Sequence, residues 1–515
     1  MNDYIVTQQD IELLMQSNKT LYYKLELLND KFQVVDLLEG NLISDNISIS
    51  ADSDVRRTYT CQLVVTNSSF VLGRESKIWF DKKIRPYIGI LHNRTKEIVW
   101  YLLGTFLYTD LNYSYDATSK TLSLTCLDMM CLLNDSRNGV IPDYRRTILE
   151  GTSSRAVIIS LLEEFGITKY FIEFNINNNV VSTFEIPYDM VYNANSNVYT
   201  VIKDIVSLYP GTQMFFDLDG TFIIKPIPTK KDEINMLTDD IVQPILINEQ
   251  VSTSLSNVYN HIKIWGKINE PDYYTKAVTI SNNIYNAELV VTKIDEDTGE
   301  TVDVEYAEYE NFDVFALRVP NTNKEAQRIS INGLDSKLIV NSDGSTLEAG
   351  YLEADVDYIF RYRVESDDFL YLSQYQVYGE AYLTNIKDDT NEYAVINEDS
   401  DLSVEKIGDI LKVLTGGDYD LLYTNQLAET RARYELYNYT NKQHSLSITT
   451  MFIPWLDVNM KIQFTSNLIK ENSEYLVTNI SCDYSTGQMT INLNRYYSDY
   501  IWLKGGNKWA LLIKI

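Results

Sequence analysis

Short runs in which apolar and polar residues alternate are the feature that most limits what this chain can fold into. In residues 58–65 every odd-numbered residue is apolar, and the even-numbered ones are polar except for Val64. A period of two residues places successive side chains on opposite faces of a β-strand. Runs compatible with strands recur near both ends, which predicts a mainly β protein with α+β insertions. The expected strands are 21–27, 33–38, 46–50, 58–65, 87–91, 98–103, 105–115, 121–127, 261–265, 445–448, 461–464, 475–481 and 488–493.

Other segments change to a helical period. Apolar residues one helical turn apart predict helices over 153–165 and 197–209, and a hairpin turning at 217–220 should follow the second. Shorter signals predict helices at 10–16, 403–414 and 425–437. The expected capping and terminating residues are Ser153 or Ser154 with Gly166 for the first helix, and Asn195 or Ser196 with Pro210-Gly211 for the second.

The chain has 515 residues, which at about 150 residues per domain indicates three to four domains. Where the period changes, domain boundaries are expected. The predicted parts are an N-terminal β-barrel at 1–135, an α+β helix–hairpin module at 140–245, a second β-barrel made of 250–265 and 435–500, an insertion of hairpins and helices at 268–434, and a C-terminal strand or tail at 501–515.

One hairpin near the end of the first predicted barrel is echoed near the C-terminus. Thr109 and Tyr115 precede a turn, as Thr478 and Tyr484 do later, and alternating apolar residues follow each turn. Two interpretations remain open, because alternating strands recur by chance in any β protein. The echo marks either a duplicated barrel or a coincidence.

Residue patterns that carry chemistry are scarce. The three histidines, His92, His261 and His444, are far apart in sequence, and no helix zinc signature, nucleophile elbow or Walker loop occurs. We therefore predict no catalytic residues, no metal site and no cofactor. The four cysteines are expected to be buried small hydrophobes, since so few cannot form a disulfide framework in so long a chain.

The run Ile453-Pro-Trp-Leu456 is a candidate contact of a different kind. An apolar run between strands most often buries its indole at a domain or subunit contact. We predict that Pro454, Trp455 and Asp457 form a structural anchor and not a ligand site.

The charge balance limits the possible partners. The chain carries 44 Lys and Arg against 72 Asp and Glu, a formal net charge of −28. A chain with this charge is unsuited to binding duplex DNA through contacts with its phosphates. No apolar run approaches the ~20 residues that span a bilayer, and no signal peptide is evident near the N-terminus. We expect no membrane span and no general secretory export.

Several strings occur in a fixed order near the two ends of the chain. The N-terminal strings are NISISADSDVRRT (46–58), IRPYIGI (84–90), EIVW (97–100), LGTF (103–106) and CLDMMCLL (126–133). The C-terminal strings are IPWLDVN (453–459), GQMT (487–490) and RYY (495–497). Taken in order, these strings resemble the baseplate hub family of phage tails that infect Gram-positive bacteria. The likeness covers both ends and the module at 195–227, while 268–400 is unmatched.

This resemblance implies a homotrimeric, non-enzymatic hub in the virion tail, made in the host bacterial cytoplasm. Two barrels per chain would present six similar barrels to a six-fold tail tube. The implied partners are the tail tube or distal tail ring protein, a tail spike or tip protein, and other baseplate proteins. DNA would pass through an axial channel without specific binding, and the acidity would serve that passage or only solubility.

An alternative remains at the sequence level. Related tail proteins often carry a C-terminal cell-wall hydrolase, and this chain is expected to lack that extension because it ends soon after Tyr500. A tail-tip hydrolase would then need its site in the unmatched residues 268–400. A histidine and carboxylates converging in a cleft there would favour that alternative.

Overall fold

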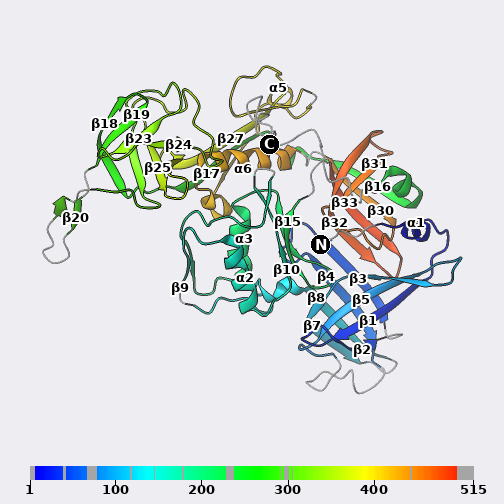
Figure 1. Ribbon diagram of the computed structural model, residues 1–515. Coiled ribbons are helices and arrows are strands. Elements are labelled where there is room, and N and C mark those ends of the chain that lie inside the picture. The colour runs from blue at the N-terminus through cyan, green and yellow to red at the C-terminus, as the bar shows by residue number, and fades with distance from the viewer. Residues whose placement is uncertain are drawn as a thin grey trace. The chain divides into compact units, whose positions relative to one another are not determined.

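Two compact units make up the chain in the computed structural model (Figure 1). The first combines Met1–Val258 with Asn441–Ile501, and the second combines Tyr259–Thr440 with Trp502–Ile515. The predicted mainly β fold with α+β insertions is confirmed. The structure describes residues 6–38, 42–65, 78–115, 119–143, 145–176, 179–227, 237–289, 292–294, 301–303, 306–398, 400–440 and 444–495.

In the described residues, a sheet of 13 strands organises the first unit. Its order is β16-β30-β33-β32-β3-β4-β8-β7-β5-β1-β2, with β31 paired to β32 and β6 paired to β5. Both predicted barrel segments therefore share one sheet and one apolar core. The strands are β1 Leu21–Leu28, β2 Val34–Leu38, β3 Leu42–Ser50, β4 Arg57–Val64, β5 Lys83–Leu91, β6 Ile98–Leu102, β7 Phe106–Tyr115, β8 Lys120–Asp128, β16 Leu246–Thr253, β30 His444–Met451, β31 Lys461–Thr465, β32 Asn472–Asp483 and β33 Gln488–Arg495.

The two ends of the chain meet at the pairing of β3 with β32. Ile47 lies opposite Cys482 and Ile49 opposite Ile480, and all four side chains are buried in the shared core. Between them, polar residues point to the other face, as the two-residue period requires. The alternation seen in the sequence is thus what lets segments more than 400 residues apart close one sheet.

The hairpin echo predicted from the sequence has a matching backbone irregularity. In the β7–β8 pair the register shifts at Thr109, and in the β32–β33 pair it shifts at Thr478. Each of these bulged threonines donates its hydroxyl to the carbonyl of the facing strand at 3.1 Å, to Thr125 in the first hairpin and to Asn492 in the second. A shared bulge with a shared hydrogen bond favours duplication over coincidence.

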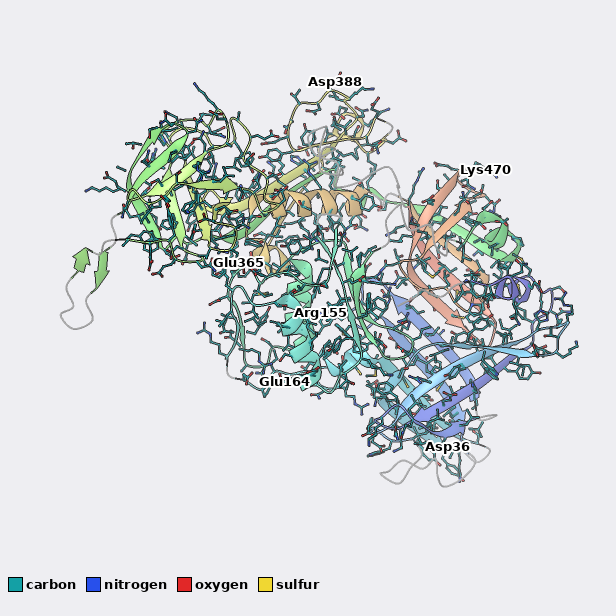
Figure 2. All side chains as sticks on the ribbon, in the orientation of Figure 1. Asp36, Arg155, Glu164, Glu365, Asp388 and Lys470 are labelled. Atoms are coloured by element: carbon teal, nitrogen blue, oxygen red, sulfur yellow. The ribbon has the colours of Figure 1, made fainter. Side chains whose placement is uncertain are left out.

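A helix–hairpin module interrupts the sheet in sequence between β8 and β16. Ser153, one of the two predicted caps, caps α2 by accepting from the Ala156 N–H. Glu164, labelled in Figure 2, is the last residue of that helix and pairs with Arg146 at 2.7 Å. The elements outside the large sheet are α1 Gln8–Leu14, η2 Met129–Leu132, β9 Arg145–Ile148, α2 Ser154–Glu164, β10 Tyr170–Ile172, β11 Phe174–Ile176, β12 Asn179–Val181, β13 Met190–Asn193, α3 Val198–Ser207, β14 Thr212–Phe216, β15 Phe222–Pro226, α4 Asp239–Val242, η3 Gln243–Ile245 and η4 Leu255–Asn257.

The cap of α3 differs from the prediction. Asn197, not Asn195 or Ser196, accepts from the Thr200 N–H at 2.8 Å. Asn195 instead takes a left-handed φ of 70° in the preceding turn, so it lies outside the helix. Asparagine suits both positions, which is why the pattern alone did not separate them.

The second unit contains a closed barrel and a four-stranded sheet, β28-β27-β17-β29, on which α6 packs. Gly379 on β27 allows that contact, because a Cβ there would lie 2.2 Å from the Ala428 carbonyl carbon. The barrel order is β18-β19-β23-β24-β26-β25-β22. The elements are β17 His261–Ile268, β18 Tyr273–Ser281, β19 Ile284–Leu289, β20 Thr292–Ile294, β21 Thr301–Asp303, β22 Val314–Arg318, β23 Arg328–Ile331, β24 Lys337–Val340, β25 Asp357–Arg363, β26 Asp368–Ser373, β27 Gln376–Thr384, β28 Ala394–Ile396, α5 Val404–Ile407, β29 Leu411–Thr415, η5 Gly417–Leu421 and α6 Asn425–Thr440.

Two predictions need correction in this unit. Residues 261–265 were expected in the second barrel of 250–265 and 435–500, but they form β17, which pairs with β27 and β29. The helix expected at 403–414 stops at Ile407, because Gly408 takes a φ of 83° and the chain then enters β29. The predicted C-terminal strand or tail at 501–515 lies outside the described residues.

Membrane crossing by a helix finds no support in the described part of the chain. None of its helices has both the length and the apolar character that crossing a bilayer requires.

Candidate functional site

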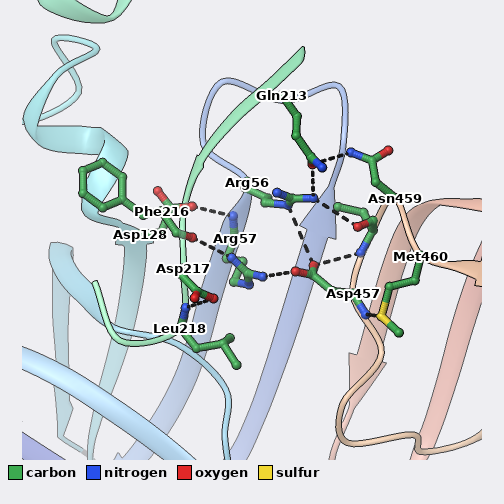
Figure 3. A network of polar contacts seen from close by, with 11 residues as sticks. Arg56, Arg57, Asp128, Gln213, Phe216, Asp217, Leu218, Asp457, Asn459 and Met460 are labelled. Atoms are coloured by element: carbon green, nitrogen blue, oxygen red, sulfur yellow. Dashed lines mark hydrogen bonds and ion pairs between the residues drawn. The ribbon is translucent and has the colours of Figure 1, made fainter. Parts of the chain in front are cut away.

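A buried polar network joins three parts of the first unit (Figure 3). Arg56 and Arg57 lie at the start of β4, Gln213 lies on β14 of the helix–hairpin module, and Asp457 lies in the connection between β30 and β31. We call these four residues, with Asp128 at the end of β8, the arginine junction. They come from the strings 46–58, 126–133 and 453–459 and from the module, so the recognised segments converge in space.

Arg57 is at the centre of the arginine junction and is only 2% exposed. Its Nη1 donates to the Phe216 carbonyl at 2.8 Å, and its Nη2 donates to the Asp457 carboxylate. Its backbone N–H donates to Asp128 Oδ2 at 2.8 Å. One residue therefore ties β4 to the module, to β8 and to the C-terminal connection.

Arg56 shares Asp457 with Arg57 and has further partners of its own. Its Nη2 donates to Gln213 Oε1 at 3.0 Å and to the Val458 carbonyl at 3.1 Å, while its Nε lies 3.8 Å from Asp457 Oδ1. The guanidinium stacks over the Phe215 ring, 3.8 Å from its centroid. A planar guanidinium can use its edge for hydrogen bonds and its face for an aromatic ring at once.

Burial and pairing set the charges in the arginine junction. Burial alone would raise the pKa of Asp457, but the guanidinium groups of Arg57 and Arg56 outweigh burial and lower that pKa. Burial lowers the pKa of Arg56 to about 10, which leaves it charged at neutral pH. Burial raises the pKa of Asp128 to about 6, against hydrogen bonds from the Met130 and Arg57 N–H groups.

This arrangement is suited to fixing geometry and not to acid–base chemistry. The carboxylate of Asp457 is ionised and engaged by both arginines, so it is not poised to exchange a proton. Removing one partner of a buried ion pair leaves a charge in a low-dielectric interior, which costs several kcal/mol. The arginine junction therefore constrains how the module and the two chain ends fit together.

The predicted anchor residues lie beside this network. Trp455 is 6% exposed and its ring centroid is 6.2 Å from that of Tyr101 on β6. Pro454 precedes it in the same turn and is half-buried. Asp457 joins the arginine junction. That these three act as an anchor stays a prediction, and nothing in the sequence pattern identified Arg56 and Arg57 as the partners of Asp457.

The histidines His92 and His261 lie outside the arginine junction and have partners of their own. On the four-stranded sheet of the second unit, His261 lies between two carboxylates, with Nε2 2.7 Å from Glu380 and Nδ1 3.0 Å from Asp409. Both ring nitrogens are thus engaged, and neither is free to act as a general base. His92 is buried and its Nδ1 accepts from the N–H groups of Arg94 and Thr95.

We searched the described residues for groups that could bind a metal ion and for accessible thiols. No group of three or more His, Cys, Asp or Glu in them could hold a metal ion. Cys61, Cys126, Cys131 and Cys482 are all free and buried, as predicted, and burial raises the pKa of each thiol.

Comparisons with known proteins give one partial family match and several neighbours in fold. A family described as a domain of unknown function (DUF5048) matches residues 399–500, which is less than half of the chain. A comparison with curated proteins gives no match.

The similar solved structures include three tail proteins. A tail protein from Neisseria meningitidis MC58 is 8% identical with a TM-score of 0.47, covering 94% of this chain and 98% of that one. The prophage MuSo2 43 kDa tail protein from Shewanella oneidensis is 10% identical with a TM-score of 0.47, covering 93% and 99%. The prophage tail protein gp18 from Listeria monocytogenes EGD-e is 10% identical with a TM-score of 0.42, covering 92% and 94%.

Proposed function

We propose that the chain is a structural baseplate hub protein of a phage tail or phage-tail-like particle. In this role it is a homotrimeric adaptor that joins the six-fold tail tube to the three-fold tail tip around an axial channel. Its partners are the tail tube or distal ring protein, a spike or tip protein and other baseplate proteins, and its location is the virion tail. A Gram-positive host stays a prediction.

The observation that carries this proposal is the repeated hairpin. The β7–β8 and β32–β33 pairs have the same bulged threonine and the same hydroxyl-to-carbonyl hydrogen bond within one sheet. A chain with two similar elements can offer six of them when three copies assemble. Closed rotational symmetry of this kind is the usual form of homo-oligomers. The repeat therefore supplies what a three-fold to six-fold adaptor needs.

The arginine junction supports the same role. The sequence strings that resemble hub proteins, at 46–58, 126–133 and 453–459, meet there through Arg57, Asp128 and Asp457. An adaptor must hold its two similar parts at one fixed angle, and a buried, oriented ion-pair network gives such geometric specificity.

Native mass spectrometry and electron cryomicroscopy test the proposal. We expect the purified chain to assemble at three times its mass of 59.5 kDa. Images of the trimer should contain six quasi-equivalent copies of the repeated hairpin around an axial channel. A stable monomer that does not join tail tube or tip proteins, or a trimer whose repeated hairpins are not related by a pseudo-six-fold axis, would contradict the adaptor role.

The cell-wall hydrolase alternative has one observation in its favour, the approach of Glu380 and Asp409 to His261. Against it, both ring nitrogens of His261 are already engaged by carboxylates. We expect the purified chain to release no soluble fragments from peptidoglycan. Activity that Glu380→Gln abolishes, with the fold unchanged, would replace the structural role with the enzymatic one.

A further inference from the structure

One face of the large sheet carries short, neutral polar side chains in cross-strand register. It extends over eight adjacent strands, β16-β30-β33-β32-β3-β4-β8-β7. We call it the polar ladder face. The polar parts of its rows of facing residues are Asn248, Thr449, Thr490, Ser481, Ser48 and Thr58; then Gln488, Asp483, Asn46, Thr60, Thr125 and Asp110; then Gln250, Ser447, Asn492, Asn479 and Ser50; and finally Ser44, Gln62, Ser123 and Asn112. The first row continues into the apolar residues Leu127 and Leu107 on β8 and β7, and the second begins at Met451 on β30.

The polar ladder face is turned away from the core. The residues between its members, such as Ile49, Tyr59 and Ile491, are buried in the core of the first unit. Ladder residues such as Ser48, Thr60 and Thr490 are exposed. A shallow pocket lies over part of the face and is lined by Ser44, Thr60, Gln62, Ser123 and Asp483, among others. The side chains of the polar ladder face are therefore accessible to solvent.

Its charge content differs from that of the rest of the chain. A soluble surface is typically designed with about 25–35% charged residues, and at that share 21 exposed or half-exposed positions would carry about five to seven charged residues. These 21 positions contain only two, Asp110 and Asp483, and no Lys or Arg, while the adjacent row on the same face runs through Asn494 and Leu476 to Lys461 on β31. The chain as a whole has 44 Lys and Arg and 72 Asp and Glu. Cationic side chains are available to this protein but do not occur in these rows.

The composition also argues against a permanent protein partner on this face. Energetically important positions of protein interfaces are rich in Trp, Tyr and Arg, and the centre of such an interface is apolar. None of the ladder rows contains an aromatic residue or an arginine. A second sheet packed here would bury hydroxyl and amide groups with little apolar area to offset their desolvation. The face is therefore suited to staying in contact with solvent.

We propose that the polar ladder face lines the axial channel of the assembled hub and faces duplex DNA in transit. The inference rests on the proposed function and specifies which surface of the chain meets the DNA. Each Lys or Arg that contacts a phosphate releases counterions and so stabilises a bound, stalled complex. Hydroxyl and amide groups can hydrogen-bond to phosphates, but they carry no charge and therefore release no counterions. Short side chains also leave the wall smooth.

The position of the face is tested by electron cryomicroscopy of assembled particles. We expect the strands β3, β4, β32 and β33 to turn the ladder residues toward the axis. A trimeric ring in which these residues face outward, or are covered by another copy, would overturn the inference while leaving the adaptor role intact. A chain that forms no ring would instead defeat the proposed function itself.

The chemistry of the face is tested by adding cations to it. Ser48→Lys, Thr60→Lys and Thr490→Lys together would place nine cations around the channel of a trimer. Because six to ten phosphate contacts make affinity fall steeply between about 50 and 200 mM salt, we expect DNA release from triggered particles to slow at least about tenfold at low salt and to recover at high salt.

Two controls accompany that experiment. The triple variant Ser48→Asn, Thr60→Asn and Thr490→Asn changes the same sites without charge and should release DNA at the normal rate. Ser160→Lys places a cation on an exposed position of α2, away from the ladder rows, and should also be neutral. If the triple-lysine particles assemble normally and release DNA at the unchanged rate, the proposed channel wall is wrong.

Discussion

Asp457 is a half-buried carboxylate that the buried side chains of Arg56 and Arg57 share. We predict that Asp457→Asn lowers the free energy of unfolding by about 3–5 kcal/mol, because the guanidinium groups of Arg56 and Arg57 stay buried without their counter-charge. Urea unfolding of the full chain measures the change.

A matched control separates this effect from loss of any ion pair. Glu471 pairs with Arg495 at an exposed position, so Glu471→Gln should cost less than about 1 kcal/mol. If Asp457→Asn is as mild as Glu471→Gln, the arginine junction does not hold the first unit together.

Asp45 on β3 should make stability depend on pH, because its pKa is raised, whereas the pKa of Asp457 is lowered. Its carboxylate is buried and accepts from the Tyr59 hydroxyl at 3.0 Å, and burial raises its pKa from 3.8 to about 7. Because the folded chain holds a proton that the unfolded chain loses, the contribution of Asp45 to stability is fully present below pH 3.8. It declines as pH rises toward 7.

Asp45→Asn should therefore abolish this decline. Asparagine keeps an oxygen for Tyr59 and cannot ionise, so we expect the variant to be more stable than wild type at pH 8, by on the order of a few kcal/mol, with a smaller difference at pH 5. Denaturant unfolding of both proteins at pH 5 and pH 8 measures the difference. A variant that is equally or less stable at pH 8 would show that ionisation of Asp45 does not destabilise the folded chain.

At the scale of elements, the connection between β30 and β31 is fixed by an aromatic contact. Trp455 packs against Tyr101 of β6, so we predict that Trp455→Ala costs about 3–5 kcal/mol of unfolding free energy. Trp100, next to Tyr101 on the same strand, is 36% exposed and is the matched control. Trp100→Ala should cost less than half as much, and equal losses would mean that Trp455 is no special anchor.

The sequence predicted most helices and strands of the first unit, because the signals for alternation, capping and turns each act over a few neighbouring residues. The alternation in β4, the cap Ser153 and the turn at 217–220 each act within a few residues, and each appears in the structure. The failures come from long-range pairing. Residues 411–414 were predicted to continue a helix, yet together with Thr415 they form β29, because a parallel partner, β17, lies 150 residues earlier. Helical propensity is weak against such tertiary pairing.

The candidate site was predictable only in part for the same reason. The apolar run before Asp457 marked that segment as an anchor, but its arginine partners lie 400 residues away. Two adjacent arginines at the start of a strand that is apolar at alternate positions are a usable signal, since buried guanidinium groups need a carboxylate. The signal does not say which of 72 acidic residues supplies it.

At the scale of the whole molecule, the second unit is inserted between two paired strands of the first. The chain leaves the first unit after Val258 and returns at Asn441, and Thr253 on β16 lies directly opposite His444 on β30. Exit and return are therefore neighbours. An insertion of this kind can be removed without opening the sheet, because the strand pair that flanks it is part of the first unit.

We predict that replacing residues 259–440 with a short Gly/Ser linker leaves the first unit folded. The β16–β30 pair and the arginine junction lie wholly within the retained residues, so the shortened chain should unfold cooperatively and should still lose about 3–5 kcal/mol on Asp457→Asn. Circular dichroism during urea unfolding provides the measurement. If the shortened chain aggregates or unfolds without cooperativity, whereas the full chain does not, the second unit supports the first and the division into an assembly core with an insertion is wrong.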